Sequence, residues 1–230
     1  MMPEPQKKQA ALSPATALAC ALVLGCVLIA AFEAAFQPAY AVKSAVKVAL
    51  FTGLPLLASR LCGGGALGVL RPIWRKEALL APLLLGVAVY AAIVGGYFLL
   101  RRWVDFSGIA GAQGASGIDR GNLAYVALYV CLVNCPLEEF FFRGAGYLAL
   151  RQAMGDRPAM LLSSACFCAY HVAIMDGWFA PLPFVGLLAA LFAAGLFLCY
   201  IDKRANSPLP AWAVHLFANA GIYTVAFLLF

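Results

Sequence analysis

The amino-acid sequence predicts an all-α membrane protein, a polytopic transmembrane helical bundle with about seven spans, within a range of about six to eight. Hydrophobic residues make up 64% of the 230 residues, and charged residues only 11%. The mean hydropathy of +0.90 is far above that of a soluble globular domain. The apolar residues also gather into runs of about 20, the length that a helix needs to cross a bilayer. We therefore expect a single integral membrane domain over residues 1–230.

Apolar runs mark the expected helices in order along the chain. Five runs are long and uninterrupted, and each is expected to cross the bilayer once. These five are Pro14–Phe36, Ala78–Leu100, Pro158–Met175, Pro181–Ile201 and Leu209–Phe230.

Two further runs are less regular. Leu123–Met154 is too long for one simple span and contains Pro136, which has no backbone N–H, so a kink or break is expected there. Tyr40–Leu61 carries Lys43 and Lys47 in its first turns. Either these lysines extend their side chains to the lipid headgroups, or the segment lies partly in the interface.

Cations in the loops predict the orientation of the bundle. With residues 1–13 as a cytoplasmic tail, ten Lys and Arg residues fall on the inner side and five, Lys47 among them, on the outer side. The bias favours a cytoplasmic N-terminus. The compact Ala- and Leu-rich chain has no organellar signal and indicates a bacterial inner (cytoplasmic) membrane. The net charge of +6 does not indicate a nucleic-acid partner, because the cations lie mostly at the expected helix ends.

Polar side chains inside the expected spans are the strongest indication of function. A charge near the bilayer centre costs roughly 2.5 to 3.5 kcal/mol on insertion scales, so it needs a partner, a polar cavity or a reaction to serve. Several such residues occur here, and they include both histidines of the chain. The set is Asn134, Glu138, Glu139, Arg143, His171, His215 and Asn219.

The spacing of these residues predicts how they are arranged. Residues four apart share one face of a helix, so Glu139 and Arg143 are expected to form a pair, and His215 and Asn219 to project together. Glu138 differs from Glu139 by about 100° around the helix, so the two carboxylates point in different directions. This leaves Glu138 free to face a cavity.

Three motifs occur in order, each inside an expected span: Glu138-Glu139-x-x-x-Arg143, Phe167-x-x-x-His171 and His215-x-x-x-Asn219. Together they resemble the three motifs of the CPBP family of intramembrane proteases. That family is also called the CAAX protease and bacteriocin-processing, or Abi, family, and it includes the Ras-converting type of CAAX endopeptidase. The resemblance covers the motif-bearing half of the chain, residues 123–230, and no motif is matched before it.

The resemblance implies an intramembrane glutamic endopeptidase with its active site within the membrane, between the spans that carry the motifs. The substrate would be a membrane-anchored peptide or protein, cleaved at a C-terminal tail or in a precursor. Amide hydrolysis needs a base for water, a proton donor and donors to the oxyanion, and these residue types can supply all three. The implied roles are Glu138 as general base, His171 as its assistant, His215 and Asn219 as oxyanion donors, Glu139 and Arg143 as supports, and Phe167 as packing beneath His171.

Three alternatives stay open. No cofactor is expected, but Glu138, His171 and His215 would also make a possible zinc set, in which Asn219 has no evident task. The second alternative is a non-catalytic family member that acts as a membrane scaffold or in bacteriocin immunity, but the complete set of motif residues favours an enzyme. A transporter with a Glu and His proton relay is less favoured, because the polar residues occupy only one half of the chain.

Overall fold

The structure, a computed structural model, describes residues 13–62 and 79–230, and every regular element in these ranges is helical. The predicted all-α class is confirmed. The predicted cytoplasmic tail, residues 1–13, lies outside the described residues except for Ser13. The elements are α1 (Pro14–Phe36), α2 (Tyr40–Leu61), α3 (Leu80–Leu100), α4 (Ser107–Ala115), α5 (Leu123–Tyr129), η2 (Val130–Asn134), α6 (Cys135–Glu138), η3 (Glu139–Ala149), α7 (Arg151–Met154), α8 (Asp156–Ile174), α9 (Pro181–Ala205) and α10 (Leu209–Leu229), where η denotes a π-helix.

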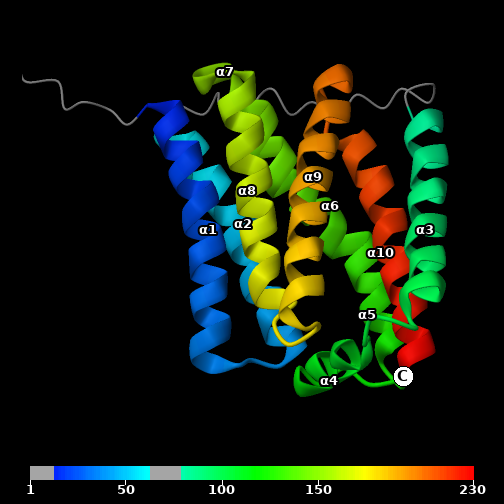
Figure 1. The fold of residues 1–230 in the computed structure, drawn as a ribbon. Helices are drawn as coiled ribbons and strands as arrows, with labels where there is room; N and C mark the ends of the chain where they lie inside the picture. The colour runs from blue at the N-terminus through cyan, green and yellow to red at the C-terminus, as the bar shows by residue number, and fades with distance from the viewer. Residues whose placement is uncertain (1–12, 63–78) are drawn as a thin grey trace, which may run out of the picture.

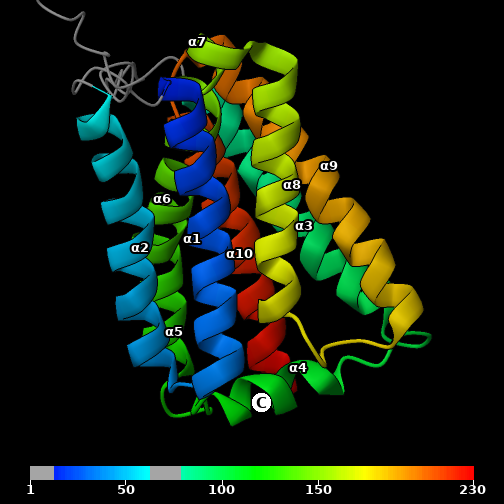
Figure 2. The same ribbon diagram turned by 90° about the vertical axis from the view of Figure 1, so that its left-hand side faces the viewer.

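The long helices stand side by side along one common direction (Figure 1). The start of α1 and the C-terminus lie at opposite ends of the bundle, and α4 lies across the end that holds the C-terminus (Figure 1). Figure 2 shows that α9 is splayed away from its neighbours at the α4 end.

The first two helices form an antiparallel pair. Ser13 caps the start of α1 by accepting a hydrogen bond from the backbone N–H of Thr16 at 3.1 Å. Gln37 ends the helix in a left-handed conformation with a φ of 43°, and Pro38 cannot continue it. The chain then turns directly into α2, which packs along α1.

Within residues 13–62 and 79–230, six helices are long and apolar enough to cross a bilayer, which agrees with the predicted range. These are α1, α2, α3, α9, α10 and one composite helix, Leu123–Met154, built from α5, η2, α6, η3 and α7. The seventh expected span, Pro158–Met175, is helical as α8 but is not among these six. α8 nevertheless packs on α1, α9 and η3 at the same height in the bundle (Figures 1 and 2). Polar residues that face the interior, such as the fully buried Ser163 and Ser164, make it less apolar.

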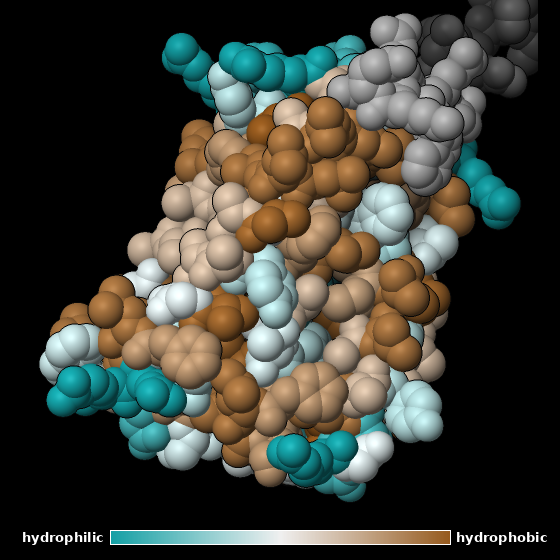
Figure 3. All heavy atoms as spheres, turned by 90° about the vertical axis from the view of Figure 1, so that its right-hand side faces the viewer, coloured by the Kyte–Doolittle hydropathy of each residue, from teal (hydrophilic) through white to brown (hydrophobic). Residues whose placement is uncertain are grey.

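The polarity of the bundle is the reverse of that of a soluble protein. Gly86 is the only buried residue of α3, and large apolar side chains such as Leu84 (63% exposed) and Leu182 (84% exposed) cover the surface. Figure 3 shows apolar residues across the middle of one face, with hydrophilic residues at its two ends. In contrast, the ionisable side chains of Lys47 and Glu138 are buried. An apolar band of this kind matches the hydrocarbon of a bilayer, and the protein is an integral membrane protein.

The composite helix is not broken at Pro136. Instead, it alternates between α-helical and π-helical turns, and η2 directly precedes the segment that contains the proline. A π-helical turn widens the helix and redirects the side chains that follow it, and it accommodates a residue that cannot donate a backbone hydrogen bond. Glu138 ends α6 and Glu139 begins η3, so the two carboxylates lie at a junction between the two helix types.

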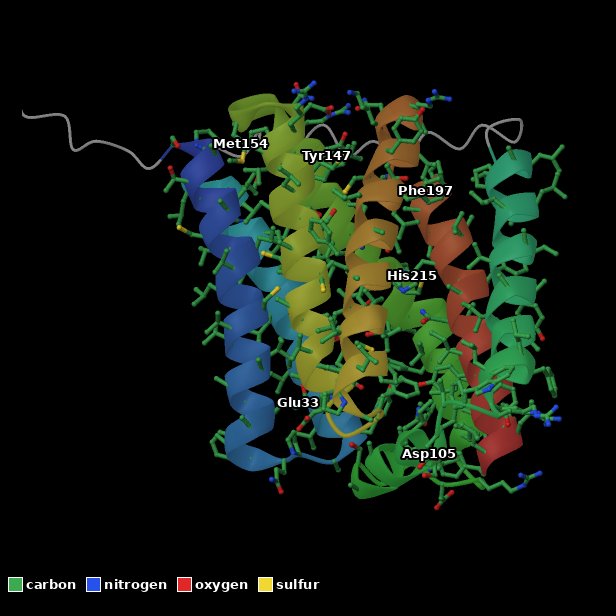
Figure 4. All side chains as sticks on the ribbon, in the orientation of Figure 1. Glu33, Asp105, Tyr147, Met154, Phe197 and His215 are labelled. Atoms are coloured by element: carbon green, nitrogen blue, oxygen red, sulfur yellow. The ribbon has the colours of Figure 1, made fainter. Side chains whose placement is uncertain are left out.

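The expectation that both lysines of α2 reach the headgroups or lie in the interface is wrong for Lys47. Lys43 pairs with Glu33, which Figure 4 shows near one end of the bundle. Lys47, one turn further along, is only 4% exposed and neither reaches the headgroups nor lies in the interface. It must be removed from the five outer cations, which leaves four, and the orientation stays a prediction. Several inner cations, Lys7 and Arg71 among them, lie outside the described residues.

Candidate active site

Three helices bring the motif residues to one cavity of about 670 Å³. The composite helix contributes Glu138, α8 contributes Phe167 and His171, and α10 contributes His215 and Asn219. All five line the same cavity, although they come from segments up to about 80 residues apart in the sequence. The structure thus places together the side chains that the motifs single out, while their chemical roles stay predictions.

The cavity lies deep in the apolar part of the bundle. Figure 4 shows His215 near the middle of the bundle's height. Glu33 and Asp105 mark one end in that view, and Met154 marks the other. His215 therefore lies well away from both ends of the bundle.

Glu139 and Arg143 form a buried ion pair behind the cavity wall. Nη1 of Arg143 donates to Oε1 of Glu139 at 3.2 Å, and both side chains are at most 2% exposed. The pairing expected from their spacing is therefore present. The guanidinium also lies over the ring of Phe167, 4.1 Å from its centroid, which adds a cation–π contact.

His215 lies between the two adjacent glutamates. Its Nδ1 is 2.6 Å from Oε1 of Glu139, and its Nε2 is 3.7 Å from Oε2 of Glu138. An ionised carboxylate only accepts hydrogen bonds, so Nδ1 carries a hydrogen and donates it to Glu139. Glu139 therefore fixes the ring orientation and tautomer, in addition to pairing with Arg143.

His171 is fixed by its own helix. Its Nδ1 is 2.7 Å from the backbone carbonyl oxygen of Phe167, and the two rings lie in contact with centroids 4.4 Å apart. A carbonyl oxygen only accepts, so Nδ1 donates and Nε2 of the neutral ring holds the lone pair. The ring that lines the cavity thus offers a proton acceptor there.

Asn219 lies one helical turn beyond His215 and lines the same cavity. Its amide nitrogen Nδ2 is buried and has no hydrogen-bond partner among the described residues. A buried amide donor without a partner is uncommon in proteins. In a cavity, such a donor is available to a ligand or a reacting group.

Glu138 is not free, contrary to the expectation from spacing. Its Oε1 accepts a hydrogen bond from Nζ of Lys47 at 2.5 Å and another from Nδ2 of Asn134 at 2.9 Å. Lys47 also donates to the side-chain oxygen of Asn134. Only Oε2 of the carboxylate remains directed toward His215. The reactive carboxylate of the predicted site therefore has a lysine counter-ion that sequence reasoning did not identify.

Asp202 on α9 is a second polar residue that sequence reasoning missed. It is fully buried, and its Oδ1 accepts the backbone N–H of Ala211 at 2.9 Å, in the first turn of α10. Asn206, with a φ of 49°, ends α9 and begins the short turn that makes this approach possible. Asp202 thereby caps, from another helix, the helix that carries His215. In the sequence it precedes two exposed cations and resembles an ordinary loop charge.

Aromatic rings form the floor of the site. Phe51 stacks on Phe141 with centroids 3.9 Å apart, and Phe142 meets both rings edge-on. Phe167 continues the cluster from Phe142 at 5.3 Å, and Tyr170 packs against Phe51 at 5.4 Å. This rigid packing holds α2, α8 and η3 in fixed register beneath the polar groups.

The remaining walls of the cavity are apolar and come from α3, α4 and α9. Val89, Ile109 and Leu191 are examples from each of the three helices. α4 approaches the loop after α8 so closely that a Cβ at Gly108 would lie 2.5 Å from the carbonyl oxygen of Gly177. Figure 3 shows a hollow in the face formed with α3, where paler residues lie between apolar ridges. An apolar chamber with one polar wall suits a partly apolar ligand.

Metal coordination is poorly supported by the positions of the side chains. Among the described residues, no group of three or more His, Cys, Asp or Glu side chains is placed to hold a metal ion. The ammonium group of Lys47 also lies directly on Glu138, one of the three residues of the zinc alternative, and would repel a cation there.

The motif residues thus meet in one cavity near the middle of an apolar helical bundle. Residues 120–221 match the family model of type II CAAX prenyl endopeptidase Rce1-like proteins, and this segment is an Rce1-like domain. The match confirms the family resemblance, contains all seven motif residues and supports a membrane protease at the level of the family. Neither a curated protein nor a solved structure matches the chain.

Proposed function

We propose that this protein is an intramembrane glutamic endopeptidase that hydrolyses a peptide bond of a membrane-anchored protein or peptide. The observation that carries the proposal is the cavity in which Glu138, His171, His215 and Asn219 meet at the middle of the bundle. Each of these groups can supply a part of amide hydrolysis, and the family match gives the same class of reaction.

Glu138 is the proposed general base. Its Oε1 is held by Lys47 and Asn134, which leaves Oε2 to remove a proton from water. The water oxygen then adds to the carbonyl carbon of the substrate, and the electron pair of the C=O bond moves to the oxygen. His171, whose Nε2 is an acceptor, assists in orienting the water. When the C–N bond breaks, the proton passes to the leaving amine and the other product is a carboxylate.

His215 and Asn219 are the proposed oxyanion donors. The side-chain amide of Asn219 is a buried donor without a partner in the described residues. Nε2 of His215 donates when the ring carries both hydrogens, and two flanking carboxylates favour that form. Glu139 and Arg143 support this donor by fixing the ring, and Phe167 packs between Arg143 and His171.

We propose that the reaction needs no metal ion. The lysine on Glu138 supports this view, because it supplies the positive charge that a metal would otherwise bring to the carboxylate. Activity should persist in EDTA, and purified protein should contain no stoichiometric zinc. Loss of activity in EDTA that zinc restores would establish the zinc-dependent alternative instead.

The substrate is proposed to reach the cavity from the bilayer, as the C-terminal tail of a membrane protein or as a peptide precursor. The loop cations support a cytoplasmic N-terminus, and we propose a bacterial cytoplasmic membrane as the location. Terminal proteomics of membrane proteins should reveal termini that change between the wild type and Glu138→Gln. An unchanged set of termini would count against a protease, and an effect that Glu138→Gln retains would indicate a non-catalytic scaffold or an immunity protein.

A further inference from the structure

Lys47 lies two turns from the start of α2, outside the segment that matches the protease family. That segment begins at residue 120, whereas Lys47 belongs to the N-terminal pair of helices. Its side chain is only 5% exposed, whereas lysine side chains are mostly exposed in proteins. A fully buried lysine within a membrane span requires a specific partner.

The contacts of Lys47 all lead to the candidate site. Nζ donates to Glu138 at 2.5 Å and to the oxygen of Asn134, and it lies 4.7 Å from the ring centroid of Tyr170. Asn134 donates in turn to the same oxygen of Glu138 at 2.9 Å. The lysine, the amide and the carboxylate therefore form a closed triangle of hydrogen bonds, which restricts the carboxylate to one orientation.

Among the described residues, Lys47 is the cation that donates a hydrogen bond directly to Glu138. Arg143 is engaged with Glu139 on the other side of the helix. His215 is 3.7 Å from Glu138 and also bonded to Glu139, and His171 is bonded to a backbone carbonyl. Lys47 and Arg143 thus each pair with one of the two glutamates. Removing Lys47 would leave a carboxylate buried among apolar and aromatic side chains, where the charged form is disfavoured.

We infer that Lys47 is a positioning residue of the site: it holds Glu138 ionised with Oε1 engaged and Oε2 directed into the cavity, so that α2 is part of the catalytic unit. The inference deepens the proposed function and rests on it. It assigns to the N-terminal helices a task beyond anchoring, because the base cannot be oriented without them. A lysine at this position also explains why α2 packs against α6 and η3 within the bundle.

The first test measures cleavage in proteoliposomes, on a substrate found by the terminal comparison. Lys47→Met should lower kcat by about 100-fold at neutral pH, with a smaller change in KM, because the base loses its counter-ion. Lys47→Arg keeps the charge and should recover much of the rate. Lys203→Met is the control, because Lys203 pairs with Asp156 at the other end of the bundle and does not line the cavity, and it should retain activity near that of the wild type.

The pH profile separates positioning from simple loss of structure. In Lys47→Met, the acid limb should move to higher pH by about one unit or more, since the carboxylate then ionises less readily. Lys47→Arg should restore its position. An unmoved acid limb in Lys47→Met would overturn the inference. Other titratable groups that face Glu138 or Lys47 are Cys26, Tyr40, Cys135, Tyr170, His171, His215 and Tyr223.

A second test does not depend on catalysis. Thermal unfolding in detergent should show that Lys47→Met and Glu138→Gln each lower Tm. The fall in Tm of the double variant should be smaller than the sum of the falls in the two single variants. Purely additive losses would refute the ion pair and with it the inference. If the wild type cleaves nothing while the coupling is present, the proposed function fails and Lys47 is left as a structural counter-ion.

Discussion

Nδ1 of His215 donates a hydrogen bond to Oε1 of Glu139 at 2.6 Å, and the two residues are 76 positions apart in the sequence. Glu139 is one residue from the proposed base, so adjacent carboxylates of the composite helix contact opposite edges of one imidazole. Their divergence around the helix, which the sequence predicts, is what lets them approach the ring from two sides. These two contacts restrict the rotation of the ring. This favours His215 as an oriented hydrogen-bond donor in the site over a role only in helix packing.

Replacing Glu139 by Gln should therefore impair catalysis more than folding. The neutral amide of Gln removes one of the two carboxylates that favour the doubly protonated ring, and the neutral ring of His215 is a weaker oxyanion donor than the charged one. We expect a fall in kcat of at least about 100-fold in Glu139→Gln, measured by steady-state cleavage.

Glu33→Gln serves as the control for this variant. Glu33 is also a carboxylate in an ion pair, with Lys43, but this pair lies near one end of the bundle. It should leave kcat close to that of the wild type. Wild-type kcat in Glu139→Gln would show that the orientation of His215 by Glu139 has no part in catalysis.

Asn219→Ala should remove one oxyanion donor without disturbing the other groups. Its amide nitrogen has no partner among the described residues, so few existing contacts are lost. Loss of such a donor lowers kcat by about 10²- to 10³-fold in a well-studied hydrolase. Asn219→Asp has nearly the same size but cannot donate when ionised, and it should be no more active than Asn219→Ala. If Asn219→Asp retained the wild-type kcat, the amide would not act as a donor.

Asp202 offers a test of how α10 is positioned. Asp202→Ala removes the acceptor for the backbone N–H of Ala211 and should destabilise the protein by about 0.5 to 2 kcal/mol, the range measured for lost helix caps. Asp202→Asn keeps an oxygen acceptor and should be much closer to the wild type. Thermal unfolding in detergent measures both. Equal stability of Asp202→Ala and the wild type would mean that the start of α10 is held by other contacts.

Much of the fold follows directly from the sequence, because apolar runs of bilayer length define helices without reference to any partner. The bounds of α1, α2 and the composite helix agree with the predicted runs. The π-helical turns around Pro136 could not be predicted, since a proline in a span permits a kink, a break or a widened turn. Which of these forms depends on the helices that pack against it.

In the candidate site, spacing in the sequence predicted contacts between residues of the same helix, but it did not predict contacts between helices. The Glu139–Arg143 pair depends on such spacing and is present. The contact of Lys47 with Glu138 depends on how α2 is rotated against the composite helix, and no local pattern reports that rotation. A lysine two turns from a helix start looks the same whether it faces lipid headgroups or a buried carboxylate. Asp202 was missed for the same reason, because its partner belongs to the next helix.

Asp156 forms an ion pair with Lys203 at the end of the bundle opposite α4. Asp156 accepts hydrogen bonds from Lys203 at 2.5 Å and from Tyr147 at 2.8 Å, and the bond from Lys203 holds the pKa of this carboxyl below its usual range. A lowered pKa in the folded state adds stability above the unfolded pKa of about 3.9, and this stability is lost as the pH falls. Asp156→Asn should therefore lower the unfolding free energy slightly at pH 7, by less than about 1 kcal/mol, because the pair is partly exposed. The difference from the wild type should shrink in acid and in high salt, measured by thermal unfolding across pH. A difference that stays constant from neutral pH to below about pH 3 would show that the ion pair does not act through the charge of Asp156.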